Sequence, residues 1–225
     1  YAAPAAYYFP TAGRMRGIEV RKGSIQIKHG PYTTGGALNL ISTPIPKAFS
    51  GRTNLSVGQN SARNLQAYIG DAYPNFAWLV ETYQANVDGY KKLDGGGDTG
   101  FDKKDYLAKF RFNTNREGDL YQEVMVKLGQ TDETSHETYL GLTDQDFAAT
   151  PYRRYAGSQV DRMDTDQEQF QIRYFVQPGE TFDLTSIAYR SNFKRNWYKL
   201  NKVRATEGGS RASIGSILDP PGNYA

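Results

Sequence analysis

Apolar and polar residues alternate along most of this chain with a period of two, at which successive side chains of a β-strand point to opposite faces. In "KDYLAKFRFNT" (104–114), apolar side chains take the even positions from Tyr106 onward, and mostly basic or amide side chains take the odd ones. The segment "QEQFQIRYFVQ" (167–177) repeats this pattern from Phe170 onward. Almost no stretch has the spacing of an amphipathic helix. The sequence therefore predicts an all-β protein whose strands have one apolar and one polar face.

Seven segments carry this strand-like pattern, and polar stretches rich in Gly, Asp, Asn and Pro separate them. The last segment is irregular, because Phe182 and Leu184 have one parity whereas Ile187 and Tyr189 have the other. A β-bulge produces such a change of parity, so we expect a bulge there. The seven predicted strands are 52–59, 63–72, 76–87, 104–114, 119–130, 167–177 and 181–192.

The connections between the predicted strands differ in length. Those after the second, fourth and sixth strands are short turns, "YPN", "NREG" and "PGE", whereas the connections at 88–103 and 131–166 are long and polar. The first connection, "NSA", is also short. Short turns at one end and long loops at the other are typical of an outer-membrane β-barrel. A soluble β-sandwich also has strands with one wet face, so the pattern favours a barrel and leaves a sandwich open.

Composition narrows the function classes. The chain has 225 residues with 17 Tyr, 11 Phe and 23 Gly but no Cys, which excludes a disulfide scaffold and thiol chemistry. Its net charge of +3 comes from 27 basic and 24 acidic residues that are mixed along the chain, without the basic stripe of a nucleic-acid binder. It has no apolar run long enough for a transmembrane helix, and "YAAPAAYYFP" is not typical of a signal peptide. The chain is therefore either soluble or a membrane-spanning β-barrel.

A sharp corner precedes the first predicted strand. In "KHGPYTTGGALNLISTPIP" (28–46), the pair Gly35 and Gly36 permits a tight turn. The apolar segment "ALNLIS" follows it, and Pro44 and Pro46 then end strand pairing and favour an extended linker. This arrangement predicts a domain boundary near residue 46.

Residues 13–46, "GRMRGIEVRKGSIQIKHGPYTTGGALNLISTPIP", resemble the end of the plug domain of TonB-dependent outer-membrane receptors. Two further segments, 138–155 ("TYLGLTDQDFAATPYRRY") and 188–201 ("AYRSNFKRNWYKLN"), resemble the ferric-citrate branch of that family. One departure is His29, where the family commonly has Tyr before Gly-Pro. The matching plug positions are Ile18, Glu19, Val20, Lys22, Gly23, Gly30, Pro31, Gly35, Gly36, Asn39 and Ser42.

The resemblance implies a division of the chain. Residues 1–46 are expected to be the C-terminal part of a plug, and residues 47–225 the first strands and extracellular loops of a transmembrane barrel. Barrels that hold a plug have about 22 strands. The seven predicted strands are therefore an incomplete wall with two unpaired edges, and the start of the plug with its TonB box lies outside the chain.

The resemblance also implies partners and a location. We expect the outer membrane of a Gram-negative bacterium, with lipid, lipopolysaccharide and the remaining barrel strands as neighbours. TonB would act through the region before this chain, and the substrate would be a ferric chelate. No resident cofactor is expected, because iron stays within its chelator, and no nucleic-acid partner is expected.

Three sequence features could be interpreted as phosphate- or metal-binding sites, but for each of them a structural interpretation is favoured. "DGGGDTG" (94–100) lacks the Lys-Ser/Thr of a phosphate loop and the final Glu of a calcium loop, so we expect a flexible loop. "DRMDTDQE" (161–168) is expected to be a solvated acidic loop rather than a divalent-cation site. His29 and His136 have no further ligands at a suitable spacing. No nucleophile and base pair is visible, so the chain is predicted not to be an enzyme.

The candidate ligand-binding residues form three groups. The first group belongs to an expected apical loop of the plug, and its side chains can alternatively pack as aromatic residues against the barrel wall. The second group lies in a loop whose arginines suit an anionic chelate. One of these arginines can instead pair with "DQD" or with lipopolysaccharide phosphate. The third is a looser group that also includes Lys199. The candidates are Tyr7, Tyr8 and Thr11 in the first group, Tyr152, Arg153 and Arg154 in the second, Arg195 and Trp197 in the third, and His29 as a separate candidate.

The favoured hypothesis is a fragment of a TonB-dependent receptor that imports a ferric siderophore or ferric-carboxylate complex. TonB-dependent importers of cobalamin or oligosaccharide share the same fold and remain alternative hypotheses. A soluble β-sandwich carbohydrate-binding module is a further alternative. A passive porin has no plug, so residues 13–46 argue against it.

Overall fold

The computed structural model describes residues 9–23, 35–204 and 207–214. The strands are β1 (Met15–Lys22), β2 (Gly36–Ser42), β3 (Ser50–Val57), β4 (Arg63–Ala72), β5 (Phe76–Val87), β6 (Lys92–Leu93), β7 (Phe101–Asn113), β8 (Tyr121–Ser135), β9 (Arg153–Arg154), β10 (Arg162–Gln177), β11 (Leu184–Tyr198), β12 (Lys202–Val203) and β13 (Ala212–Ser213). The helices are η2 (Ala12–Arg14), α1 (Asp144–Ala149) and η4 (Ala156–Ser158). No helix among the described residues is long and apolar enough to cross a membrane.

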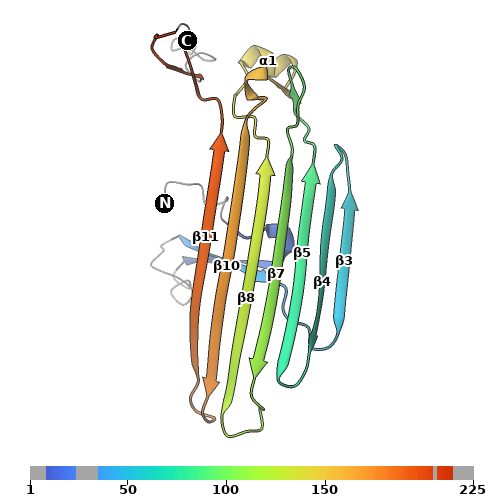
Figure 1. Cartoon of the computed structure of the whole chain (residues 1–225), viewed down its shortest axis with the longest axis vertical. Helices are drawn as coiled ribbons and strands as arrows, with labels where there is room; N and C mark the ends of the chain where they lie inside the picture. Colours follow the sequence, from blue (N-terminus) through green and yellow to red (C-terminus); the bar gives the residue numbers. More distant parts are fainter. Residues whose placement is uncertain (1–8, 24–34, 205–206, 215–225) are drawn as a thin grey trace.

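Seven long strands form one sheet in the order β11-β10-β8-β7-β5-β4-β3. Every neighbouring pair is antiparallel, and each strand pairs with the next long strand along the chain. Short turns connect the strands at one end of the sheet, and the long connections with α1 gather at the other end (Figure 1). This up-and-down arrangement confirms the predicted fold class.

The predicted strand bounds agree with β4 and β5, are shifted by two residues at β3, and differ by up to six residues at the ends of the other strands. β8 continues to Ser135 and β10 begins at Arg162, so both extend several residues further toward the long connections than predicted. Apart from the buried Met163, the side chains of these extensions are polar on both faces, so the apolar alternation on which the prediction depended is absent.

The expected bulge in the seventh strand is wrong. β10 and β11 pair in continuous register from Arg162 with Tyr198 to Val176 with Leu184. Phe182 precedes β11, so its parity has no bearing on the strand. The apolar side chain of Ile187 belongs to the opposite face from Leu184, which explains the change of parity without a bulge.

The even-numbered positions of β5, β7, β8 and β10 form one convex, largely apolar face toward the short-turn end. Its aromatic side chains are exposed: Tyr106 is 47%, Phe112 50% and Phe170 44% exposed. No second sheet covers this face within the described part of the chain. A β-sandwich would bury these side chains against a partner sheet, so the structure does not support the sandwich alternative.

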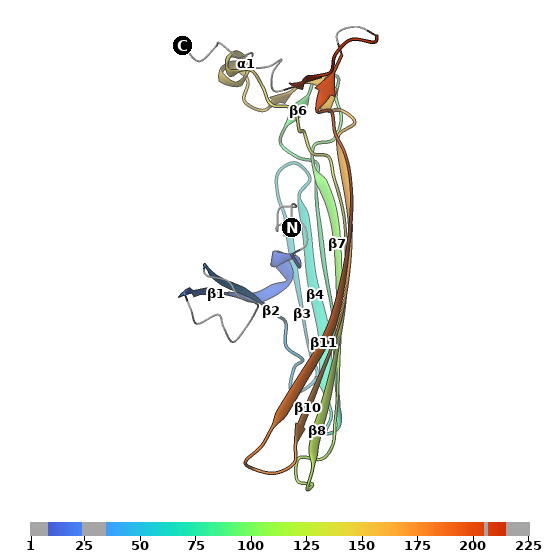
Figure 2. The same ribbon diagram turned by 90° about the vertical axis from the view of Figure 1, so that its left-hand side faces the viewer.

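The N-terminal segment lies on the opposite, concave face. Figure 2 shows β1 and β2 projecting from this side of the sheet, with η2 next to the wall. β1 and β2 pair as an antiparallel hairpin, for example Val20 with Leu38. At the corner, Gly36 has φ +139°, and a Cβ there would lie 2.4 Å from the carbonyl oxygen of Arg21. A glycine is therefore required at this turn.

Close backbone contact holds the segment against the wall at two glycines. A Cβ at Gly13 would lie 2.5 Å from Cζ of Tyr83 on β5. A Cβ at Gly70 on β4 would lie 2.8 Å from Cδ of Pro46 in the linker. A side chain at Gly70 would clash with Pro46 and also with the Trp78 carbonyl oxygen on β5, 2.6 Å from the Cβ, whereas a side chain at Gly13 would require the Tyr83 ring to move.

A buried ion pair joins the same two parts. The Arg14 guanidinium in η2 donates to the carboxylate of Asp105 on β7, and the two side chains are 2% and 0% exposed. Thr131 on β8 also donates to Asp105, at 2.8 Å. Nearby, the Thr43 hydroxyl donates to Glu81 at 2.9 Å. Lys109 Nζ donates to the carbonyl oxygen of Thr43 at 2.5 Å.

We expect Asp105→Asn to destabilise the protein strongly, because it leaves the buried Arg14 charge without its counterion. Removing one partner of a buried ion pair costs about 3–5 kcal/mol. The control is Glu133→Gln, which removes a pair with Lys103 at 2.6 Å whose side chains are 21% and 25% exposed. That change should cost less than about 1 kcal/mol. Unfolding midpoints of the full-length protein measure both variants, and equal losses would contradict the structural role of Arg14 and Asp105.

Candidate functional site

The long connections fold together at the end of the sheet opposite the short turns. β6 and β9 pair in parallel, with Lys92 opposite Arg153 and Leu93 opposite Arg154. Two backbone bonds of 2.8 Å fix this pair, from Lys92 N to Tyr152 O and from Asp94 N to Arg154 O. The pairing brings the arginine pair predicted from sequence next to the glycine-rich segment.

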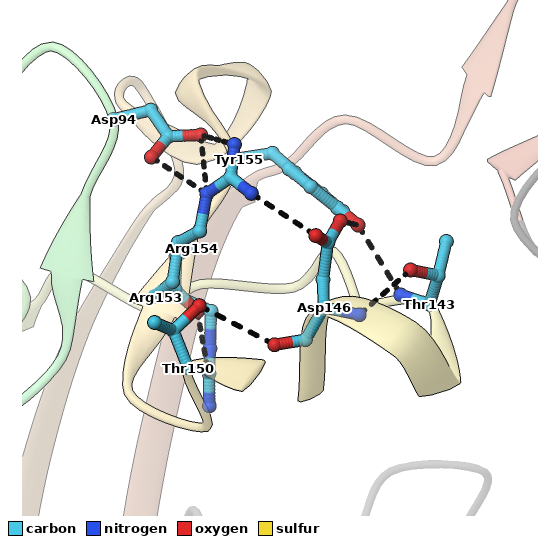
Figure 3. Close-up of polar contacts among 7 residues, drawn as sticks. All are labelled: Asp94, Thr143, Asp146, Thr150, Arg153, Arg154 and Tyr155. Carbon is cyan, nitrogen blue, oxygen red and sulfur yellow. Dashed lines mark hydrogen bonds and ion pairs between the residues drawn. The ribbon is translucent and has the colours of Figure 1, made fainter. Parts of the chain in front are cut away.

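Arg153 is held between two carboxylates (Figure 3). Its Nε and Nη2 each lie 2.9 Å from Asp94, on Oδ1 and Oδ2 respectively. Its Nη1 lies 3.2 Å from Oδ1 of Asp146 in α1. The pKa of Arg153 is raised, chiefly by its hydrogen bond to Asp94. Arg153 thus joins the connection after β5 to the connection after β8.

Asp146 stands at the centre of a second set of bonds. The Tyr155 hydroxyl donates to its Oδ2 at 2.5 Å, and the Asp146 amide donates to the Thr143 hydroxyl, which caps α1, at 3.2 Å. The pKa of Asp146 is lowered, first by the Tyr155 hydrogen bond and further by the charge of Arg153. These bonds stabilise a six-residue helix that has no buried side chain of its own.

Arg154 has a different environment from Arg153. Its Nη1 donates to the carbonyl oxygens of Pro151 at 2.9 Å and Arg153 at 2.5 Å. Among the described residues it forms no ion pair with a carboxylate. The pKa of Lys91 is lowered by burial and then by the positive charge of Arg154, so these two cations are neighbours. Lys91 Nζ donates to the Thr138 hydroxyl at 2.8 Å.

The glycine-rich segment after β6, for which the sequence predicts a flexible loop, contains a hydrogen-bonded turn in the structure. Gly95, Gly96 and Gly97 have φ of +86°, +80° and +131°, which favour glycine. Gly96 N donates to Leu93 O at 3.0 Å, and Gln159 Nε2 donates to Gly96 O at 2.9 Å. The turn presents Asp94 to Arg153.

The acidic stretch at 161–168 also differs from its prediction as a loop. Asp161 is 1% exposed and accepts backbone N–H bonds from Tyr139 at 2.9 Å and Leu200 at 3.0 Å. The rest of the stretch lies in β10, where Arg162 Nε donates to Asp164 at 2.9 Å. No group of three or more His, Cys, Asp or Glu side chains suited to a metal occurs in the described residues.

The third candidate group lies where β11 leaves the sheet. The Lys199 ammonium lies 3.6 Å from the ring centroids of both Tyr139 and Trp197. The two rings meet edge to face at 5.7 Å, and the Arg195 guanidinium lies over Trp197 at 5.5 Å. Cation–π attraction therefore fastens the end of β11 to the connection after β8.

The remaining candidates are scattered. Tyr152 is exposed and packs edge to face on Tyr90 at 5.9 Å. Thr11 is 7% exposed, so its hydroxyl does not point into solvent as the apical-loop hypothesis expects. Asn39 Nδ2 donates to Glu19 at 3.1 Å. Tyr7, Tyr8, His29, Gly30 and Pro31 lie outside the described residues.

Sequence reasoning did not identify Asp94 and Asp161 as structural carboxylates. Asp146 was anticipated only as part of "DQD", a possible partner for one arginine, and it pairs with Arg153. The helix that carries Asp146 was not predicted, although Thr143 with an acidic residue three positions later is a helix-start signal. Asp94 has no comparable local signal, because its partner is 59 residues away.

The sequence matches no protein-family model and no curated protein. Among solved structures, the chain is similar to the siderophore receptor PiuA from Acinetobacter baumannii, with a TM-score of 0.60 and 13% identity over 82% of this chain. It covers 27% of the length of that receptor. A weaker match is the copper transporter OprC, with a TM-score of 0.44 and 12% identity, covering 96% of this chain and 38% of that one. The likeness to PiuA shows the fold: the sheet corresponds to part of an up-and-down β-barrel.

Protonation of Asp146 should open the loop cluster. Because its folded pKa is depressed, its contribution to stability is present above the ordinary carboxyl pKa of about 4 and is lost as pH falls through the folded value. Hydrogen exchange in α1 of the full-length protein, corrected for intrinsic rates, should therefore be constant from about pH 7 to 5 and faster below about pH 4.

Asp146→Asn should increase hydrogen exchange in α1 already at neutral pH. Asp144→Asn, at the exposed start of the same helix, should retain the wild-type dependence of exchange on pH. An unchanged pH profile in the Asp146 variant would show that another group controls the opening.

Proposed function

We propose that this chain is part of a TonB-dependent outer-membrane receptor that imports a ferric siderophore or ferric-carboxylate complex. Residues 1–46 are the end of its plug, and the seven-stranded sheet is part of its transmembrane barrel in a Gram-negative outer membrane. The ligand binds on the side of the long connections, and energy delivered through TonB moves the plug. The proposal assigns no catalytic step and no resident cofactor.

The observation that carries this proposal is the combination of an open apolar convex face with an N-terminal segment seated on the concave face. Lipid is the natural partner of an apolar band on an up-and-down sheet. The buried ion pair of Arg14 with Asp105 fixes the position of the N-terminal segment on the concave face. A passive porin has no plug, so its barrel wall would not need a binding position for such a segment.

Charge in the long connections supports an anionic ligand. Arg153 is neutralised by Asp94 and Asp146, so its role is to hold the loops together. Arg154 and Lys91 keep their positive charges without a described carboxylate partner within ion-pair distance. We therefore assign chelate binding to Arg154 with Lys91 rather than to both members of the arginine pair. An uncharged oligosaccharide would gain little from these cations.

Deletion of the full-length gene, followed by uptake assays under metal starvation, tests the proposed function. Loss of uptake of one ferric chelate, restored by the intact gene, is the expected result. Unchanged uptake of every ferric chelate would overturn the proposal, and loss of cobalamin or oligosaccharide uptake instead would identify one of the alternative substrates.

Arg154→Ala should weaken binding of an anionic ferric chelate by about 1.5–3 kcal/mol, the contribution of a charge-assisted hydrogen bond. The loss should shrink at high salt, because exposed charges are screened. Arg154→Lys should recover part of the affinity, since it keeps the charge but loses the planar fork. Titration of the purified full-length receptor with ferric citrate measures the three proteins.

Arg153→Ala is the matched comparison. It should increase hydrogen exchange in α1 and at β6, where Arg154→Ala should not. Wild-type affinity in the Arg154 variant would remove this residue from the binding site.

A further inference from the structure

A cavity of about 420 Å³ lies between the linker after β2 and the concave face of the sheet. Ser42, Pro44 and Ile45 close it on the linker side. The wall side comes from β7, β8 and β10 and contributes Lys109, Arg111, Met125, Lys127, Gln171 and Arg173. Every charged residue of this lining is basic.

The cavity lies on the far side of the N-terminal segment from the long connections. Lys109 and Arg111 follow Asp105 along β7, which runs toward the short-turn end (Figure 1). Arg173 lies near the end of β10 at the same side. A ligand that moves along this face from the long connections toward the short turns would therefore reach the cavity after it passes the ion pair of Arg14 with Asp105.

Described carboxylates compensate only part of this charge. Arg173 pairs with Glu123 at 3.0 Å. Glu81 and Asp105 attract Lys109 and Lys127 but form no ion pair with them. Glu81 is already bonded to Thr43, and Asp105 to Arg14.

Two of the cations have no described hydrogen-bond partner. Arg111 Nε is buried and unbonded within the described residues. Lys127 stands opposite Lys109 in the register of β7 and β8, so two ammonium groups are neighbours on one face. Placing like charges together in a partly buried cavity is unfavourable unless an anion enters.

The rest of the N-terminal segment cannot supply that anion. Glu19 is the only acidic residue among residues 1–50, and it is engaged by Arg21 at 3.0 Å and Asn39 at 3.1 Å. The same fifty residues contain six Lys and Arg residues, so the net charge of the segment is positive.

We propose that the cavity lined by Lys109, Arg111, Lys127 and Arg173 is a second anion-binding site, which holds an anionic chelate in transit after it leaves the long connections. The carboxylate or other oxyanion groups of the chelate bind the guanidinium and ammonium donors, as such groups do in protein sites. This inference rests on the proposed import function and extends it to a site beyond the N-terminal segment.

Lys127→Gln is the informative variant, because Lys127 has no described bond that the substitution would break. Lys127→Arg keeps the charge and serves as the conservative control. Arg52→Gln is the matched control for charge loss: Arg52 lies on β3, lines a different cavity on the other side of the linker and is not part of the proposed site. Arg111→Gln combined with Lys127→Gln should enlarge the effect.

Two measurements on the full-length receptor separate transit from surface binding. Ferric citrate binding to cells without energy reports the outer site, and the maximal rate of energised ferric citrate uptake reports passage. We expect Lys127→Gln to lower the maximal rate several-fold with unchanged affinity, and Lys127→Arg and Arg52→Gln to behave as wild type. A wild-type rate in the Arg111 and Lys127 double variant would overturn the inference.

A direct probe distinguishes this inference from the proposed function. Crystals of the full-length receptor soaked in selenate should show anomalous selenium signal in the cavity, and the signal should disappear in the double variant. If deletion of the gene leaves uptake of every ferric chelate unchanged but selenate binds in the cavity, the proposed function fails and the anion site stands. Absence of the selenate signal in the wild type, or a carboxylate from another part of the receptor filling the cavity, would overturn the anion site.

Discussion

The alternation of side chains between two different environments is the constraint on which the structure depends. A strand has only two faces, and here the even positions of β5, β7, β8 and β10 are largely apolar toward the short-turn end while the odd positions carry most of the charge. A register slip of one residue would move Lys109 and Asp105 to the convex face and Phe110 to the concave one. The continuous antiparallel register across the long strands therefore fixes both surfaces at once.

The concave surface in turn determines where the N-terminal segment lies. Asp105 accepts from both Arg14 and Thr131, and Glu81 accepts from both Thr43 and Gln66. Both carboxylates are buried, with Asp105 0% and Glu81 4% exposed, and each accepts a bond from the segment and another from the sheet. The neighbouring basic side chains remain without equal compensation among the described residues. The N-terminal segment and the proposed anion site therefore lie on one charged surface.

The sequence was informative where the physics is local. Period-two alternation located every long strand, and the glycine pair with the prolines located the turn before β2 and the linker after it. Prediction was poor where the partner is distant in sequence. Asp94, for which the sequence predicts a flexible loop, pairs with Arg153, and Asp161 is buried and accepts backbone N–H bonds from Tyr139 and Leu200. The upper parts of β8 and β10 were missed because their two polar faces give no alternating signal.

The concave face meets the N-terminal segment, and the convex face is proposed to meet lipid. This chain has no cysteine of its own, so single cysteines at positions 124 to 128 of β8 can carry a spin label in the full-length protein reconstituted in bilayers. Collision with oxygen, which is concentrated in lipid, should be high for the labels at Val124, Val126 and Leu128. It should be low for those at Met125 and Lys127. Labels at the even positions that collide mainly with a water-soluble relaxant, or a profile without the period of two, would contradict the account.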